Sequence, residues 1–143
     1  MLTGIEIENF ILIQKQQISL QPGLSVITGA TGAGKSMLMK AIAFVFGEKP
    51  SGQCILPGES SATVSLHFQL TASQVLERVT QVIPELNSGE LTLTRKINSK
   101  NKTSMWINQH PATLKEIKRL QPELLCWQKQ HAQLICQDSE WQQ

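Results

Sequence analysis

Three patterns in the sequence predict an α/β fold, formed by residues 1–143 as a single domain. Residues 4–8 alternate between isoleucine and glutamate, which is typical of a strand with one buried face. Residues 24–28 form a short, mostly apolar run and lead into the glycine-rich stretch 29–34. Residues 35–46 have almost no polar face, which predicts a helix buried on all sides. We therefore expect a mixed sheet, in which an antiparallel N-terminal part lies beside the strand that precedes the buried helix.

The remaining elements follow from alternation, turn residues and helix caps. Alternating apolar residues predict further strands, and the polar stretch 98–102 predicts a turn between two of them. Thr113 begins a short helix, with Glu116 three residues later as in a capping box. Gly47 predicts the end of the buried helix. The expected strands cover 11–20, 63–70, 91–97, 103–107 and 124–127, and the further helices cover 71–79 and 113–120.

Composition excludes several classes of function. Lys and Arg total 13 against 11 Asp and Glu, and a net charge of +2 excludes a strongly basic tail. The cysteines and histidines show no zinc-site spacing, so free thiols in a reducing compartment are expected. The N-terminus lacks the features of a signal peptide, and the longest apolar run, 41–46, is far too short for a membrane span. These observations predict a cytoplasmic protein without a membrane partner.

One motif is specific enough to indicate chemistry. Residues 29–36 fit G-x-x-x-x-G-K-[ST] without a mismatch, between an expected strand and an expected helix. Glycines let backbone N–H groups surround a phosphate, and the positive end of the helix dipole adds to the attraction. Lys35 would reach the β- and γ-phosphates of a nucleotide, and the Ser36 hydroxyl would bind Mg²⁺. The predicted phosphate- and magnesium-binding residues are Gly29, Ala30, Thr31, Gly32, Ala33, Gly34, Lys35 and Ser36.

The sequence does not supply most of the residues that hydrolyse nucleotides. A hydrolase of this class holds Mg²⁺ through an Asp at the end of an apolar strand. Asp138 is the only Asp in the chain, and the short stretch before it ends in Gln, so a helix cap or a solvated position is favoured there. A small stand-alone kinase also needs acidic metal-site residues, and a single Asp argues against that class.

Further segments accompany the phosphate motif along nearly the whole chain. They are Ile5-Glu-Ile-Glu-Asn-Phe10, Phe46-Gly-Glu-Lys49, Thr94-Arg-Lys-Ile97, Met105-Trp-Ile-Asn108 and Gln130-His131-Ala132. In this order they resemble the N-terminal region of the RecN family of bacterial DNA-repair ATPases, which belongs to the SMC-like branch of the ABC ATPases. The last segment resembles the Q-loop of that family.

The resemblance implies that the chain is the N-terminal half of an SMC/ABC-type ATPase head with a P-loop NTPase fold. It implies ATP and Mg²⁺ as ligands, with Gln130 as a sensor of the γ-phosphate that either binds Mg²⁺ or positions water. In the family, a coiled coil and a C-terminal lobe with the Walker B and signature motifs follow, so this chain is expected to be a truncated lobe. The implied partner is that C-terminal lobe, in a separate chain or lost, and the implied location is the nucleoid.

Four basic residues stand in the expected hairpin without an acidic residue among them. On an exposed turn, such charges are typical of contacts with the phosphate backbone of DNA. The alternative, which the residues alone favour, is a solvated turn that protects the edge of the sheet from aggregation. The candidate DNA-contacting residues are Arg95, Lys96, Lys100 and Lys102.

These expectations combine into one functional hypothesis and one alternative. The hypothesis is an ATP- and magnesium-binding lobe of a RecN-like ATPase, which takes part in the recombinational repair of DNA double-strand breaks and hydrolyses hardly any ATP by itself. The alternative is a degenerate, non-enzymatic lobe or truncated remnant that acts only through protein contacts. Ala30, where the family usually has Glu, supports the alternative.

Overall fold

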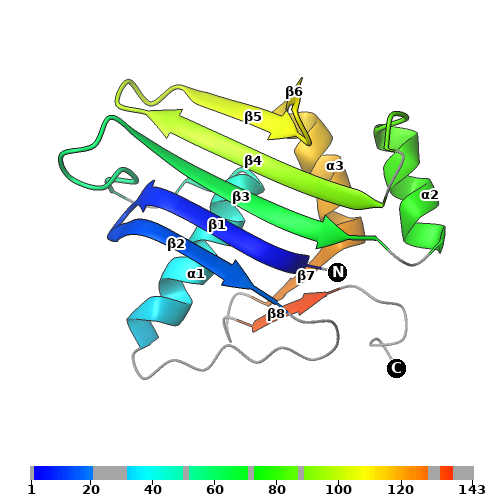
Figure 1. Cartoon of the computed structure of the whole chain (residues 1–143), viewed down its shortest axis with the longest axis horizontal. Helices are drawn as coiled ribbons and strands as arrows, with labels where there is room; N and C mark the ends of the chain where they lie inside the picture. The colour runs from blue at the N-terminus through cyan, green and yellow to red at the C-terminus, as the bar shows by residue number, and fades with distance from the viewer. Residues whose placement is uncertain are drawn as a thin grey trace.

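The central feature of the fold is a six-stranded sheet in which every pair of neighbouring strands is antiparallel (Figure 1). The computed structural model describes residues 2–20, 32–49, 52–70, 73–86, 89–128 and 133–136. The strands are β1 Leu2–Phe10, β2 Ile13–Ser19, β3 Ser61–Gln69, β4 Glu90–Asn98, β5 Thr103–Ile107 and β6 His110–Ala112. Their order in the sheet is β2-β1-β3-β4-β5-β6, so β3 and β4 lie in the middle.

Alternation along the strands gives the sheet one apolar and one polar face. In β1, Ile5 and Ile7 are buried and Glu6 is exposed, as the alternation of residues 4–8 predicted. β3 alternates between buried apolar and half-buried, mainly polar side chains over all nine of its residues. The strand register places Ile5 opposite Leu66 and Leu66 opposite Leu93, so buried side chains line up across the sheet. This apolar face forms one wall of the hydrophobic core.

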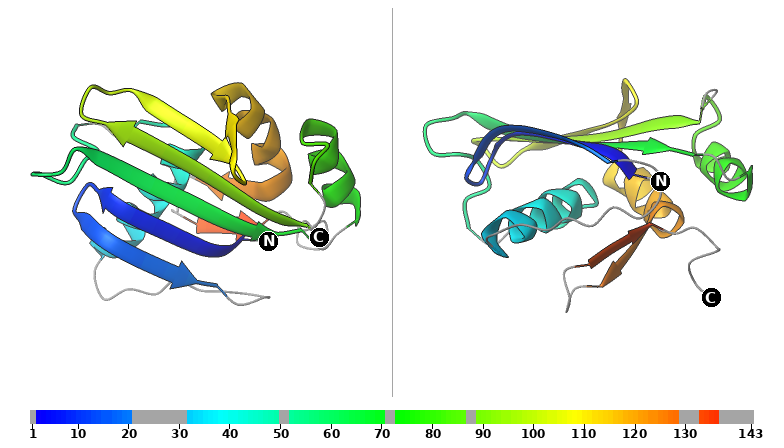
Figure 2. Two further views of the ribbon diagram at one scale, coloured as in Figure 1. Left: turned by 45° about the horizontal axis from the view of Figure 1, so that its top comes forward. Right: turned by 60° about the horizontal axis from the view of Figure 1, so that its bottom comes forward.

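Helices cover the apolar face. α1 (Gly32–Val45) and α3 (Leu114–Leu124) lie on the same side of the sheet, below it in the right-hand view of Figure 2. α1 packs against β3 and β4, while α2 (Ser73–Val82) lies at one end of the sheet and packs against α3. An antiparallel pair, β7 (Leu125–Gln128) and β8 (Gln133–Cys136), follows α3 on the helix side.

Two aromatic side chains join α1 to the sheet. Phe10 at the end of β1 and Phe44 in the last turn of α1 are fully buried, and their ring centroids are 5.1 Å apart. Burying each of these side chains away from water contributes about 1.5–3 kcal/mol to the free energy of folding. The C-terminal half of α1 is therefore held firmly against the sheet.

Most of the predicted elements are confirmed, and the fold is α/β. The polar stretch 98–102 connects β4 and β5 as a hairpin. The capping box is present, since the Thr113 backbone N–H donates to the Glu116 carboxylate and the Glu116 N–H donates to the Thr113 hydroxyl, both at 3.3 Å. Gly47 has a φ of 106° directly after α1, as expected of a glycine that ends a helix.

Several boundaries differ from the expectation. α1 begins at Gly32 instead of residue 35. Its first turn therefore includes two glycines of the motif, although glycine has a low helix propensity. α3 continues past Pro122 to Leu124, whose side chain is buried in the core and stabilises the last turn. β6 and β8 were not expected. The predicted strand 24–28, which would make the sheet mixed, lies outside the described residues.

The expectation that α1 is buried on all sides is wrong for the side of the helix that carries Ser36 and Lys40. Ser36 and Lys40 are exposed, whereas Ala41, Ile42 and Val45 are fully buried. The difference arises because α1 lies in a layer against one face of the sheet, which covers only the side that faces β3 and β4. Neither α1 nor another helix in the described part of the chain is long and apolar enough to cross a membrane.

Candidate functional site

The N-terminal end of α1 contains the second half of the phosphate motif. Residues 29–31 lie outside the described residues, and Gly32, Ala33, Gly34 and Lys35 form the first turn of the helix. The backbone N–H groups of a first helical turn have no partner within the helix, and they carry the positive end of its dipole. This turn contains no acidic residue that would repel an anion. The local structure therefore fits the binding of a phosphate group.

The position of Ser36 is compatible with a magnesium ligand. Its side chain is exposed, one turn into α1 and directly after Lys35. Within the described ranges, no three His, Cys, Asp or Glu side chains come together to hold a metal ion. Mg²⁺ is often bound by one or two protein ligands together with nucleotide phosphates, and Ser36 suits that kind of site. Gln130 and Asp138 lie outside the described residues, so their predicted roles stay predictions.

The C-terminal end of α1 is closed by a Schellman motif. The Glu48 N–H donates to the Ala43 carbonyl at 3.0 Å, and the Gly47 N–H donates to the Phe44 carbonyl at 3.1 Å. A Cβ atom at Gly47 would lie only 2.7 Å from Cδ1 of Leu114, so α3 approaches closely here. The positive φ favours glycine at position 47, and an added Cβ would also require the Leu114 side chain to shift.

Arg95 extends from β4 to the same end of α1. Its side chain is only 2% exposed, its Nη1 donates to the Phe44 carbonyl at 2.6 Å, and its guanidinium lies 4.5 Å from the centroid of the Phe44 ring. Its Nε has no hydrogen-bond partner in the described structure. Burial lowers the pKa of Arg95, and burial also raises the pKa of the neighbouring Cys54 thiol, which is free.

The predicted basic surface loses Arg95 but retains three lysines. Arg95 cannot contact DNA as predicted, because the alternation of β4 turns its side chain toward α1. Lys96, Lys100 and Lys102 are all exposed around the β4–β5 hairpin. The Asn98 side chain accepts hydrogen bonds from the backbone N–H groups of Lys100 and Lys102, each at 3.0 Å, which fixes the turn. We call Lys96, Lys100 and Lys102 the lysine surface.

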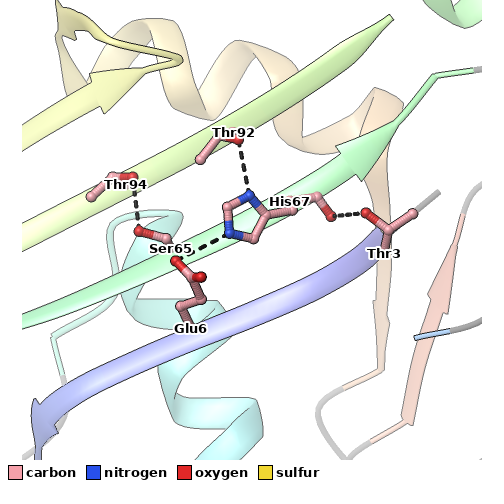
Figure 3. A network of polar contacts seen from close by, with 6 residues as sticks. All are labelled: Thr3, Glu6, Ser65, His67, Thr92 and Thr94. Atoms are coloured by element: carbon pink, nitrogen blue, oxygen red, sulfur yellow. Dashed lines mark hydrogen bonds and ion pairs between the residues drawn. The ribbon is translucent and has the colours of Figure 1, made fainter. Parts of the chain in front are cut away.

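The polar face of the sheet carries a network that the sequence analysis did not identify (Figure 3). His67 lies 3.3 Å from the Glu6 carboxylate through Nε2 and 3.0 Å from the Thr92 hydroxyl through Nδ1. Beside this group, the hydroxyls of Ser65 and Thr94 are 2.9 Å apart. Alternation placed these residues on one face, but only the strand register brings β1, β3 and β4 into contact.

Comparison with known proteins gives the class of the chain. The profile of the AAA domain family matches residues 5–142, so the chain belongs to this family. A solved structure from work on ATP-driven dimerization and DNA-stimulated activation of SMC ATPases aligns with a TM-score of 0.68 and 23% identity, over 85% of this chain and 78% of the other. The SMC head domain from Thermotoga maritima aligns with a TM-score of 0.59 and 26% identity, over 82% of this chain and 40% of the other. The fold is that of the N-terminal half of an SMC-type P-loop ATPase head.

A curated relative narrows this membership. The DNA repair protein RecN of Haemophilus influenzae is 31% identical over 99% of this chain and 26% of its own length. The chain is therefore RecN-like over almost all of its residues, and the resemblance predicted from the sequence is confirmed. The chain matches these relatives over almost all of its own residues, but it spans only about a quarter of their length.

Proposed function

We propose that the chain binds ATP and Mg²⁺ through residues 29–36, as the N-terminal half of a RecN-like ATPase head. The observation that carries this proposal is that α1 begins inside the motif, at Gly32. The unpaired N–H groups of the first turn then belong to the residues that would surround the phosphates. The dimerization of SMC ATPases with a similar fold is described as ATP-driven, which supports ATP as the nucleotide.

Each residue of the proposed site has a separate task. Lys35 would place its ammonium group against the β- and γ-phosphates, and Ser36 would bind Mg²⁺ through its hydroxyl. Gln130 is the proposed second protein ligand, by its similarity to the Q-loop. The bound Mg²⁺ neutralises phosphate charge. The exposure of Ser36 supports its assignment, since a metal and its water ligands need access.

The proposed partner is the C-terminal half of a RecN-like head, either in a separate chain or in the remainder of a longer one. The relatives are DNA repair proteins about four times as long as the matched region, which supports a head completed by further sequence. We propose a cytoplasmic, nucleoid-associated role in recombinational repair of double-strand breaks for the completed head. The lobe by itself is proposed to bind ATP and to turn it over at well below about 1 s⁻¹, the lower end for typical enzymes.

A nucleotide-binding measurement tests the proposed site. A fluorescent ATP analogue with Mg²⁺ should bind the wild-type chain, and Lys35→Ala should weaken binding by about tenfold to a hundredfold, because hydrogen bonds to charged groups contribute about 1.5–3 kcal/mol. Lys40→Ala is the matched control, since Lys40 is an exposed lysine of the same helix. It should leave the affinity unchanged.

Two results would contradict this function. A wild-type chain that is folded and binds no ATP would favour the degenerate lobe that acts only through protein contacts. Equal losses in Lys35→Ala and Lys40→Ala would indicate a general charge effect instead of a phosphate site. A turnover of about 1 s⁻¹ or more that Lys35→Ala removes would show that the chain hydrolyses ATP without a second lobe.

The lysine surface favours a second function, which is weak contact with DNA. We propose binding that is independent of base sequence, because the three lysines of this surface would contact phosphates, which carry no sequence information. Each neutralised phosphate adds about −0.9 to the slope of log affinity against log salt, so the slope should be no steeper than about −2.7. The lysines are exposed and the turn between them is fixed by Asn98, which supports this surface as a contact.

Fluorescence anisotropy of a short duplex across a salt series tests the DNA contact. The double variant Lys100→Ala with Lys102→Ala should weaken binding at low salt and flatten the salt dependence. Lys115→Ala with Arg119→Ala is the matched control, because it removes the same charge from exposed positions of α3. Equal effects of the two double variants would show that the lysine surface is a solvated turn and not the DNA contact.

A further inference from the structure

Arg95 is a buried charge that the proposed chemistry does not use. Its contacts in the described part of the chain are the Phe44 carbonyl, the Phe44 ring and the neighbouring Cys54, and none of them is a carboxylate. Its Nε is buried without a hydrogen-bond partner. Taking a charge out of water in this way has a large desolvation cost, which good remaining contacts must offset.

The contribution that an apolar side chain could not make is the charge-assisted bond to Phe44. A side chain of similar volume without charge would fill the space beside α1 and avoid the desolvation cost. A cationic donor binds more strongly than a neutral one to a carbonyl at the negative end of the helix dipole, and the distance from Nη1 to the carbonyl oxygen is short, at 2.6 Å. The Phe44 carbonyl also accepts from the Gly47 N–H, so two donors meet at one acceptor.

Phe44 is held from two strands at once. Arg95 of β4 lies against its ring and its carbonyl, and Phe10 of β1 packs against the same ring at 5.1 Å between centroids. α1 is a continuous helix of 14 residues whose first turn lies in the phosphate motif. Because α1 is continuous, fixing its last turn to the sheet also constrains the direction in which the first-turn N–H groups point.

We propose that Arg95 is a positioning residue for the phosphate site, which anchors the last turn of α1 to β4 and so holds the first turn in the orientation that binds nucleotide phosphate. The second half of this statement rests on the proposed function. The first half, the anchor itself, concerns only α1 and the sheet. The two halves are measured separately.

Amide hydrogen exchange measures the anchor without any nucleotide. In Arg95→Met, the amides of α1 should exchange at least about tenfold faster while those of β1 and β3 keep their wild-type rates. Arg95→Lys should give an intermediate rate, because it keeps a cationic donor but not the planar guanidinium. Lys96→Met is the matched control on the exposed side of the same strand, and it should change neither region. Unchanged exchange in α1, or faster exchange in helix and sheet alike, would overturn the anchor.

The affinity for ATP with Mg²⁺ measures the consequence at the phosphate site. At a temperature where circular dichroism shows the variants folded, Arg95→Met should bind ATP about tenfold to a hundredfold more weakly, because the first-turn N–H groups would no longer be held in the orientation that binds phosphate. Arg95→Lys should recover part of the loss. Wild-type affinity in an Arg95→Met protein with a loosened α1 would overturn the positioning role.

The remaining outcomes separate the two proposals. If the wild-type chain binds no ATP while Arg95→Met still loosens α1 selectively, the proposed function fails and the anchor is supported. If Arg95→Met does not fold, Arg95→Lys carries both measurements. Exchange and affinity in Arg95→Lys that equal those of the wild type would then overturn the proposal, and a selective loss in α1 would support it.

Discussion

The two faces of the sheet give neighbouring cations opposite environments. Lys96 is exposed on the polar face, whereas Arg95, one residue earlier, is buried against α1 on the apolar face. The same division separates the fully buried Leu66 from the half-buried Ser65 on β3. The comparison teaches that the position of a residue in the alternation, and not its chemical type, decides which layer of the molecule it serves.

The largest expected effect comes from shortening a side chain on the apolar face. Leu66 is fully buried in the middle of the sheet, so Leu66→Ala should lower the free energy of unfolding by about 2–5 kcal/mol. Urea denaturation followed by circular dichroism measures this loss. A change below about 1 kcal/mol would mean that the apolar face does not hold the two layers together.

A smaller effect is expected where α1 meets α3. Gly47→Ala places a methyl group 2.7 Å from Cδ1 of Leu114 at a residue with positive φ, and should cost about 1–3 kcal/mol of stability. Gly58→Ala is the control, because Gly58 also has a positive φ but no atom within 4 Å of the added Cβ. The melting temperature of each variant is compared with that of the wild type. A larger decrease for Gly47→Ala than for Gly58→Ala would measure the effect of the contact with Leu114. Equal decreases would mean that backbone strain alone accounts for the loss.

The smallest effect is expected on the polar face. Ser65→Ala removes the hydroxyl that lies 2.9 Å from the Thr94 hydroxyl, and both residues are only half-buried. Thr94 can bond to water instead, so the loss should stay within about 1 kcal/mol by the same urea denaturation. A loss as large as that of Leu66→Ala would show that the polar face contributes as much to stability as the apolar face.

Local patterns were sufficient to predict most of the described strands, the hairpin and the helix caps. Alternation predicted β1, β3, β4 and β5, and the capping box at Thr113 and Gly47 marked one helix start and one helix end correctly. These features depend on residues that are close in sequence, so a short stretch of the sequence is enough to predict each of them. The phosphate motif was located for the same reason, although α1 begins within it.

Features that depend on distant residues could not be predicted. The burial of Arg95 depends on α1, which is about 50 residues away in sequence at the Phe44 carbonyl, and the basic composition of the hairpin pointed to the surface instead. Local alternation places Arg95 in phase with the buried Leu93 and Ile97, but it contains no signal for the contact with α1. The contacts of His67 required the register of three strands, for which the sequence alone has no signal.

The short strand β6 limits how this sheet can grow. β6 has only three residues, and its central one, Pro111, pairs with Trp106 of β5. Proline has no backbone N–H to offer to a strand from another molecule, and a three-residue ladder is too brief to serve as a template. Along this side of the sheet, copies of the folded protein therefore resist joining edge to edge into β-aggregates.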